Sequence, residues 1–176
     1  MTKKALVYGL LAGVIVSIYM VIAMARCTKD MDPGTGMMLM GFASMFVAFS
    51  MIFVAVRSYR NNEGGGYITF GKAFKLGVII ALIGSTMYVI TWMIDLHFFL
   101  PDFADMYAAS EISKAQAAHK TAAEIAKITK DMDDFKVSYK NPVMVVLYTY
   151  MEILPVGLIL ALESALVFKK KVQVAA

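Results

Sequence analysis

The chain has 176 residues, of which 60% are hydrophobic and 17% are charged, and its formal net charge is +4. A soluble domain of this size holds roughly half apolar and about a quarter charged residues. The apolar residues here are gathered in blocks, each long enough for the roughly 20 residues that a membrane-spanning helix needs. The composition therefore excludes an ordinary soluble domain. The basic excess lies at the ends of the blocks, where it sets membrane topology, and it does not indicate nucleic-acid binding.

The first three apolar blocks predict transmembrane helices at residues 5–25, 37–57 and 73–97. Lys3 and Lys4 before the first block, with Ala23 and Ala25 near its end, also resemble a cleavable signal peptide. The block is longer than the core of about 7–15 residues that a signal peptide has. We therefore expect the first block to remain as a span.

Two short connections join these spans. Residues 26–36 contain Pro33-Gly34, which predicts a tight turn. Asp30 and Asp32 lie in this turn, but the loop is too short for an EF-hand calcium site. Residues 61–75 carry three consecutive glycines without the GK[ST] sequence of a phosphate-binding loop. We interpret this second connection as a flexible linker.

The third connection is the only substantial segment outside the predicted spans. Residues 102–139 show an apolar residue every three or four positions, which predicts one or two helices outside the membrane. These helices could lie on the bilayer, cap the bundle or bind a partner. Asn141 precedes a proline and is therefore pushed out of helical conformation. Pro142 can then open the fourth span, at residues 143–168.

The fourth span carries two acidic residues and a proline. Glu152 and Glu163 are eleven positions apart, about three helical turns, so they share a face that we expect to look into the bundle. Pro155 lacks an N–H, which leaves the carbonyl of Met151 without its helical partner and should bend the helix.

We predict a small polar site at this bend. Its expected members are Tyr148, Thr149, Glu152 and Pro155. Because no basic residue lies at mid-depth in any predicted span, Glu152 is expected to be a protonated, hydrogen-bonded carboxyl. The group could brace the bend, or it could relay protons.

Small residues spaced four apart predict how the spans pack, since spans associate where backbones approach closely. The first span offers Gly9, Gly13 and Ser17; the third offers Gly77, Ala81 and Ser85; the fourth offers Gly157, Ala161 and Ala165. Any of these stripes could also serve a homodimer. The second span has Phe42, Phe46, Phe49 and Phe53 on one face, which we expect to face lipid or an oligomer partner.

The sequence offers few groups for chemistry. Met20, Met24 and Cys27 are at helical spacing and could bind monovalent copper, but pliable apolar packing is the favoured interpretation. Asp95 and His97 lack a third metal ligand at suitable spacing. We therefore predict no catalytic residues, no metal and no cofactor, and a protein that is not an enzyme.

Several segments resemble a known family. "GGGYITFGKAFKLG", the aromatic-rich third span with its tryptophan, "YKNP" and "EILPVGLILALESALVFKKK" are together similar to the bacterial membrane proteins grouped as domain of unknown function family 4199. The most specific segments are Phe70–Ala73 and Glu152–Gly157. The resemblance implies a four-span integral membrane protein and supplies no activity. Glu163 falls where relatives often have an uncharged residue, so no role is carried over to it.

We expect residues 1–176 to form a single all-α membrane domain, a bundle of four transmembrane helices with a helical segment between the third and fourth spans. Charges at the span ends predict the inner (cytoplasmic) membrane with both termini cytoplasmic. The expected function is a non-enzymatic structural or accessory component of a membrane assembly. Its expected partners are the lipid bilayer and either a second copy of the chain or another membrane protein, with no nucleic acid. The alternative is a small proton- or ion-coupled transporter that uses Glu152 at the bend made by Pro155.

Overall fold

The computed structural model describes residues 1–27 and 35–170 and is all-α, as predicted. Its helices are α1 (Thr2–Cys27), α2 (Thr35–Phe49), α3 (Met51–Asn62), α4 (Phe70–Phe98), α5 (Phe103–Ala117), α6 (Ala122–Tyr139) and α7 (Pro142–Phe168). The predicted turn at Pro33-Gly34, with Asp30 and Asp32, lies outside the described residues.

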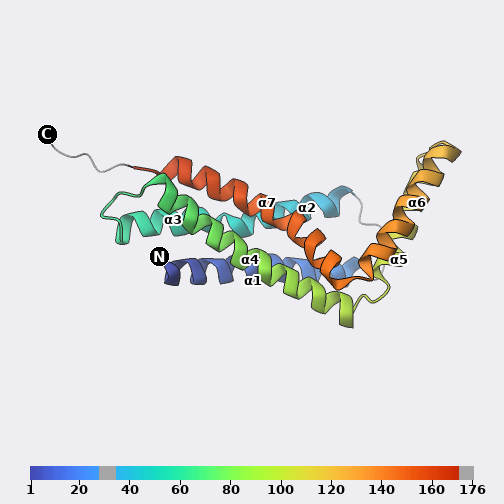
Figure 1. The fold of residues 1–176 in the computed structure, drawn as a ribbon, viewed down its shortest axis with the longest axis horizontal. Coiled ribbons are helices and arrows are strands. Elements are labelled where there is room, and N and C mark those ends of the chain that lie inside the picture. The colour runs from blue at the N-terminus through green and yellow to red at the C-terminus, as the bar shows by residue number, and fades with distance from the viewer. Residues whose placement is uncertain (28–34, 171–176) are drawn as a thin grey trace.

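The helices form a long bundle with a helical hairpin at one end (Figure 1). Four segments are long and apolar enough to cross a membrane: Thr2–Ala25, Leu39–Asn62, Phe70–Phe98 and Pro142–Phe168. The prediction of four spans is therefore confirmed. The hairpin consists of α5 and α6, and the start of α1 and the end of α7 lie at the opposite end of the bundle (Figure 1).

Side-chain caps set where three helices begin. The Thr69 hydroxyl accepts the N–H of Lys72 at 3.4 Å at the start of α4. The side chain of Asn141 accepts the N–H of Val143 at 3.0 Å, with Pro142 at the first position of α7. Thr121 and Glu124 form a reciprocal capping box at the start of α6. With these caps α4 begins three residues and α7 one residue before the predicted spans, so both helices are longer than predicted.

The second span is two helices in succession and not the single helix that its apolar run suggested. Ser50 stands between α2 and α3, and its hydroxyl donates to the carbonyl of Val47 at 2.6 Å. The backbone N–H of Ser50 still donates to the carbonyl of Phe46 at 2.9 Å. A serine whose hydroxyl bonds to a carbonyl of the preceding turn can disturb a helix locally, while the chain continues in the same direction. The span therefore keeps its length across the interruption.

The glycine and alanine stripes of α4 and α7 pack against each other. A Cβ added at Gly77 would stand 2.7 Å from the Cβ of Ala161, and one added at Gly157 would stand 2.7 Å from the Cβ of Ala81. Ala165 is also fully buried. The backbones of these two helices therefore approach as closely as the missing side chains allow.

The stripe of α1 packs against a different face of α4. A Cβ added at Gly9 would stand 2.7 Å from the Cβ of Ile83. Gly13 approaches the side chain of Met87 in the same way. The Thr91 hydroxyl donates to that of Ser17 at 3.0 Å. Ser85, the remaining residue of the α4 stripe, is buried, and its hydroxyl has no hydrogen-bond partner among the described residues. Helix α4 is thus packed between α1 and α7.

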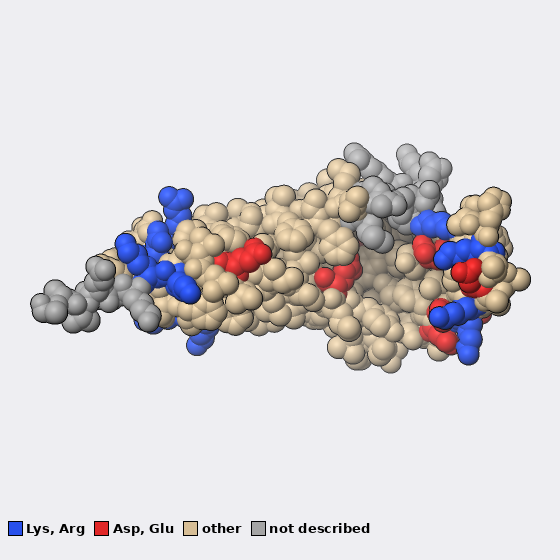
Figure 2. All heavy atoms as spheres, turned by 90° about the horizontal axis from the view of Figure 1, so that it is seen from above, with Lys and Arg blue, Asp and Glu red and all other residues tan. Residues whose placement is uncertain are grey.

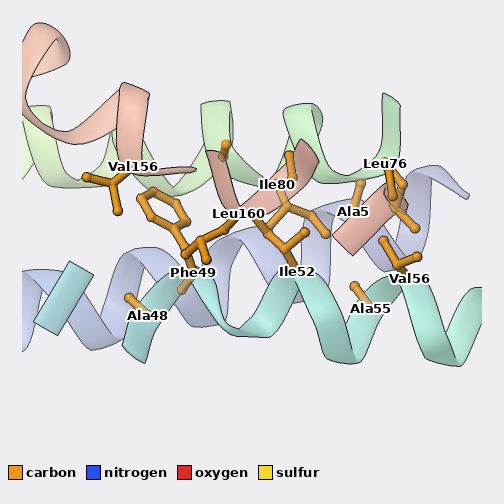
Figure 3. Close-up of a cluster of buried hydrophobic side chains, with 14 of the residues drawn as sticks. Ala5, Ala48, Phe49, Ile52, Ala55, Val56, Leu76, Ile80, Val156 and Leu160 are labelled. Carbon is orange, nitrogen blue, oxygen red and sulfur yellow. The ribbon is translucent and has the colours of Figure 1, made fainter. Parts of the chain in front are cut away.

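Phe49 lies in the middle of the core, which corrects the expectation that the phenylalanine face of the second span looks outward. Phe42 and Phe46 are exposed, but Phe49 is completely buried, beside Ala48 and Ile52. Figure 3 shows Phe49 and Ile52 reaching from their helices toward α4 and α7. The reason is space. A Cβ added at Gly84 would stand 2.9 Å from the Phe49 ring, and one added at Gly157 would stand 3.2 Å from it. The two glycines therefore leave the room that the ring fills.

The glycine-rich connection before α4 is a defined turn and not a flexible linker. Gly65 and Gly66 have φ values of +57° and +87°, which residues other than glycine rarely adopt. The N–H of Gly66 donates to the carbonyl of Arg60 at 2.9 Å. Ile68 then pairs with Lys170 through two backbone hydrogen bonds of 3.2 and 2.9 Å. This pairing fastens the start of α4 to the residues that follow α7.

Charged side chains gather at the two ends of the molecule (Figure 2). Lysines and arginines dominate the end with the termini, whereas acidic and basic residues are mixed on the hairpin end. Between these ends the visible surface is apolar apart from acidic side chains. This is the charge distribution of a protein that crosses a bilayer along the bundle axis.

Candidate functional site

Five aromatic rings join the hairpin to the bundle. This aromatic cluster consists of Trp92, Phe103, Tyr107, Phe135 and Tyr139, from α4, α5 and α6. The indole N–H of Trp92 donates to the hydroxyl of Tyr139 at 2.9 Å. Ring centres are 4.8 Å apart for Trp92 and Phe103 and 4.7 Å apart for Phe135 and Tyr139. Such pairs attract beyond their contact area, so the cluster fixes the base of the hairpin on α4.

A cavity of about 360 Å³ lies against this cluster, and we name it the aromatic pocket. Its walls come from five helices. The lining residues are Met20 and Met24 of α1, Tyr88 and Trp92 of α4, Phe103 and Tyr107 of α5, Phe135 and Tyr139 of α6, and Tyr148, Thr149 and Glu152 of α7. Figure 2 shows a recess in the apolar part of the molecule, beside one of its acidic groups.

The pocket brings together three of the four residues of the predicted polar site. Tyr148, Thr149 and Glu152 line it, whereas Pro155 is exposed and does not. The Thr149 hydroxyl donates to the carbonyl of Val145 at 2.8 Å, so it is not bonded to Glu152. The predicted hydrogen-bonded brace is therefore absent from this part of the chain. Helix α7 continues through Pro155.

The two acids of α7 do not face the interior of the bundle, so that prediction is wrong. Glu152 and Glu163 are both exposed, while Ile153, Gly157 and Ala161 are buried. At about 100° per residue, Gly157 is rotated about 140° from Glu152 around the helix. The small residues of α7 must occupy the inner arc to meet α4, which places the carboxylates outside the helix contact.

The phenols of the hairpin are neutral at physiological pH, and burial moves their pKa values further from it. Burial raises the pKa of Tyr139 to about 12; the hydrogen bond from Trp92 acts against this rise, and the negative charge of Glu152 adds to it. Burial also raises the pKa of Tyr107, with the charge of Glu111 acting in the same direction. Both side chains therefore present uncharged aromatic rings at any physiological pH.

A second cavity, of about 520 Å³, lies where α4 and α7 meet the hairpin. Its lining includes His97, Asp105, Asp133 and Lys136. Lys136 already pairs with Asp133 at 2.8 Å and lies 3.9 Å from Asp105. Since these charges neutralise one another, the cavity has no strong preference for a cation or an anion.

The candidate metal ligands are scattered. Asp95 is buried and its Oδ2 has no hydrogen-bond partner in the described part of the chain, whereas His97 is exposed. Within residues 1–27 and 35–170, no three His, Cys, Asp or Glu side chains come close enough to hold a metal ion. Met20 and Met24 line the aromatic pocket. The side chain of Cys27 lies outside the description.

Four apolar spans in one bundle, with lysines and arginines gathered at its ends, define a multi-pass membrane protein. Residues 7–170 match the family described as protein of unknown function (DUF4199). The chain belongs to this family. No curated protein and no solved structure matches it. The site residues that the sequence prediction shares with the pocket are Tyr148, Thr149 and Glu152. The five-residue aromatic cluster was missed as a unit, because its members come from three helices.

Proposed function

We propose that the protein is a non-enzymatic accessory component of a membrane assembly, and that its hairpin is the part that contacts another membrane protein. The observation that carries this proposal is an exposed helix on a rigid base. Helix α6 has no buried residue, although the aromatic cluster holds its end against the bundle. An ordered helix that keeps most of its surface exposed is available to a partner.

The exposed face of α6 has a mixed character that suits a protein partner. The exposed residues Ala123, Lys127, Lys130, Asp134 and Val137 recur every three or four positions. Charges of both signs lie between apolar residues on this face, and Val137 is 69% exposed. An anionic lipid surface would be matched by basic residues alone, so the mixture favours a polypeptide.

Site-specific crosslinking in native membranes tests the proposal. A photoreactive amino acid at Lys127 should give a crosslink to one protein, and Lys127→Glu together with Lys130→Glu should reduce the co-purified amount of that protein at least fivefold. The matched control is the same photoreactive residue at Ile90, an exposed apolar position on α4, which should crosslink to lipid alone. Crosslinks to lipid alone from both positions would remove the support for an accessory role.

One observation favours the alternative, a proton- or ion-coupled transporter. Glu152 lines a cavity, and its carboxylate has no hydrogen bond or ion pair with any residue of the described chain. Beyond it, the next buried polar side chain of α7 is Ser164, about 18 Å further along the helix at 1.5 Å per residue, and the residues buried between the two are apolar. We therefore expect proteoliposomes to show no proton flux; a flux that Glu152→Gln abolishes would establish the transporter instead.

We also propose that the protein lies in the inner membrane with both termini in the cytoplasm. Basic residues dominate the end with the termini, which is the pattern of cytoplasmic ends (Figure 2). An impermeant thiol reagent should label His119→Cys on the hairpin of intact cells and should not label Asn62→Cys, both in a Cys27→Ser background. Labelling of position 62 but not of position 119 would show that the protein has the opposite orientation.

A further inference from the structure

We propose that the aromatic pocket binds the ammonium group of an organic cation, which its rings surround and whose charge Glu152 balances. Seven of the eleven lining residues are aromatic: Tyr88, Trp92, Phe103, Tyr107, Phe135, Tyr139 and Tyr148. Aromatic ring faces attract cations, tryptophan most strongly, and sets of such rings recognise alkylated ammonium groups. This site is independent of the partner contact proposed for the hairpin.

The charge of the pocket selects a cation. Glu152 is the one charged residue among those that line it, and no lysine, arginine or histidine of the described chain does so. The same carboxylate has no hydrogen bond or ion pair with another described residue. An acid in an apolar wall is costly unless it is paired or hydrated. A bound cation would supply the missing partner.

The chemistry of the walls selects an organic cation over a metal ion. Calcium takes six to eight oxygen ligands and magnesium near-octahedral oxygen ligands, but this pocket offers one carboxylate and a few hydroxyls. The Thr149 hydroxyl already donates to Val145, and the Tyr139 hydroxyl accepts from Trp92. An alkylated ammonium needs no such ligand set, because its charge is spread over methyl or methylene groups that pack against rings.

The position of the pocket makes two sources available. Glu152 lies ten residues after Pro142, about 15 Å along the helix at 1.5 Å per residue, whereas Phe103 and Phe135 belong to the hairpin outside the span. The pocket therefore reaches from the interface into the membrane. An ammonium could enter as the headgroup of a lipid, with its tails in the bilayer, or as a free amine from water.

The chain supplies its own probe, because Trp92 is its single tryptophan and lines the pocket. Tetramethylammonium chloride titrated into the purified full-length protein in detergent should change Trp92 fluorescence in a saturable way, with sodium chloride at equal ionic strength as the reference. Glu152→Gln should weaken binding about tenfold or more. Glu163→Gln removes an exposed carboxylate from the same helix outside the pocket, and it should bind as wild type does.

A second variant keeps the test sharp if Glu152→Gln folds poorly. Tyr148→Leu removes an exposed ring from the pocket wall without altering the core, and it should weaken tetramethylammonium binding several-fold. Equal responses to tetramethylammonium and sodium, or equal affinity in wild type and both pocket variants, would overturn the proposal.

Nanodiscs distinguish the two sources. If the site takes lipid headgroups, phosphatidylcholine or phosphatidylethanolamine should shift Trp92 fluorescence relative to phosphatidylglycerol, and Glu152→Gln should remove the shift. If it takes free amines, choline added to phosphatidylglycerol nanodiscs should produce the shift. Either result supports an ammonium site. A response to neither, or a shift that phosphatidylglycerol alone produces, contradicts it.

Discussion

Replacing Gly157 with leucine should destabilise the bundle by about 3 kcal/mol, at the upper end of what overpacking a core costs. A Cβ at this position would already stand 2.7 Å from the Cβ of Ala81 and 3.2 Å from the Phe49 ring. Leucine adds three more carbons in the same direction. Helices α4 and α7 would have to separate along their stripe, which removes the close contact that holds membrane helices together.

Thermal unfolding in detergent, followed by size-exclusion chromatography, measures this loss. The matched control is Gly41→Leu in α2, where an added Cβ meets no atom within 4 Å. Both changes raise intrinsic helix propensity by up to about 1 kcal/mol, so any difference between them reports packing. If the two variants melt together, close approach at the stripe contributes little to stability.

Phe49→Ala should give the second-largest loss. In soluble cores this truncation costs about 3–5 kcal/mol, part of which is transfer from water. A bilayer or micelle reduces the transfer part, because lipid tails solvate a phenyl ring well. We therefore expect about 2–3 kcal/mol, mainly from lost contacts with the glycines of α4 and α7 around the ring.

The comparison with Phe46→Ala isolates this effect. Phe46 lies one turn earlier in the same helix and is 49% exposed. Its truncation should change the melting temperature little, since it leaves no cavity. A larger loss at Phe46 than at Phe49 would mean that the second span turns its other face toward the core.

Local patterns predicted the parts of the fold that depend on single helices. Apolar runs located the four spans, because the length of such a run is fixed by the bilayer. The spacing of Gly77 and Ala81 identified the face of α4 that meets α7. Such spacing cannot say which helix will supply the opposing stripe, and the α1 stripe in fact meets Ile83 and Met87.

The second span shows why a repeat of one residue type can mislead. Phe42, Phe46 and Phe49 share a helical face by spacing, yet only Phe49 of these three is buried. The glycines that leave room for its ring are on α4 and α7, far away in sequence. The interruption at Ser50 was equally hidden, since a serine inside an apolar run gives no sign of where its hydroxyl will bond.

The candidate site was only half visible for the same reason. Glu152 is conspicuous in an apolar run, and the general cost of a charge in lipid suggested that it points into the bundle. The small residues of α7 occupy the inner face, because they must contact α4, and the carboxylate of Glu152 therefore lies in a lateral pocket. The rings of Phe103, Tyr107 and Phe135 belong to that pocket because the hairpin packs against the bundle, and no local pattern in the sequence indicates this packing.

The packing of α7 has a consequence for how the protein is made. Because α1 to α4 precede α7 in the chain, we expect them to enter the membrane first. Until α7 follows, the stripe of Gly77 and Ala81 and the ring of Phe49 have no α7 to pack against. A nascent chain with three spans in place therefore exposes a groove to lipid or to an insertion chaperone. Entry of the fourth span covers this groove, so we expect the core around Phe49 to be completed only at that late step.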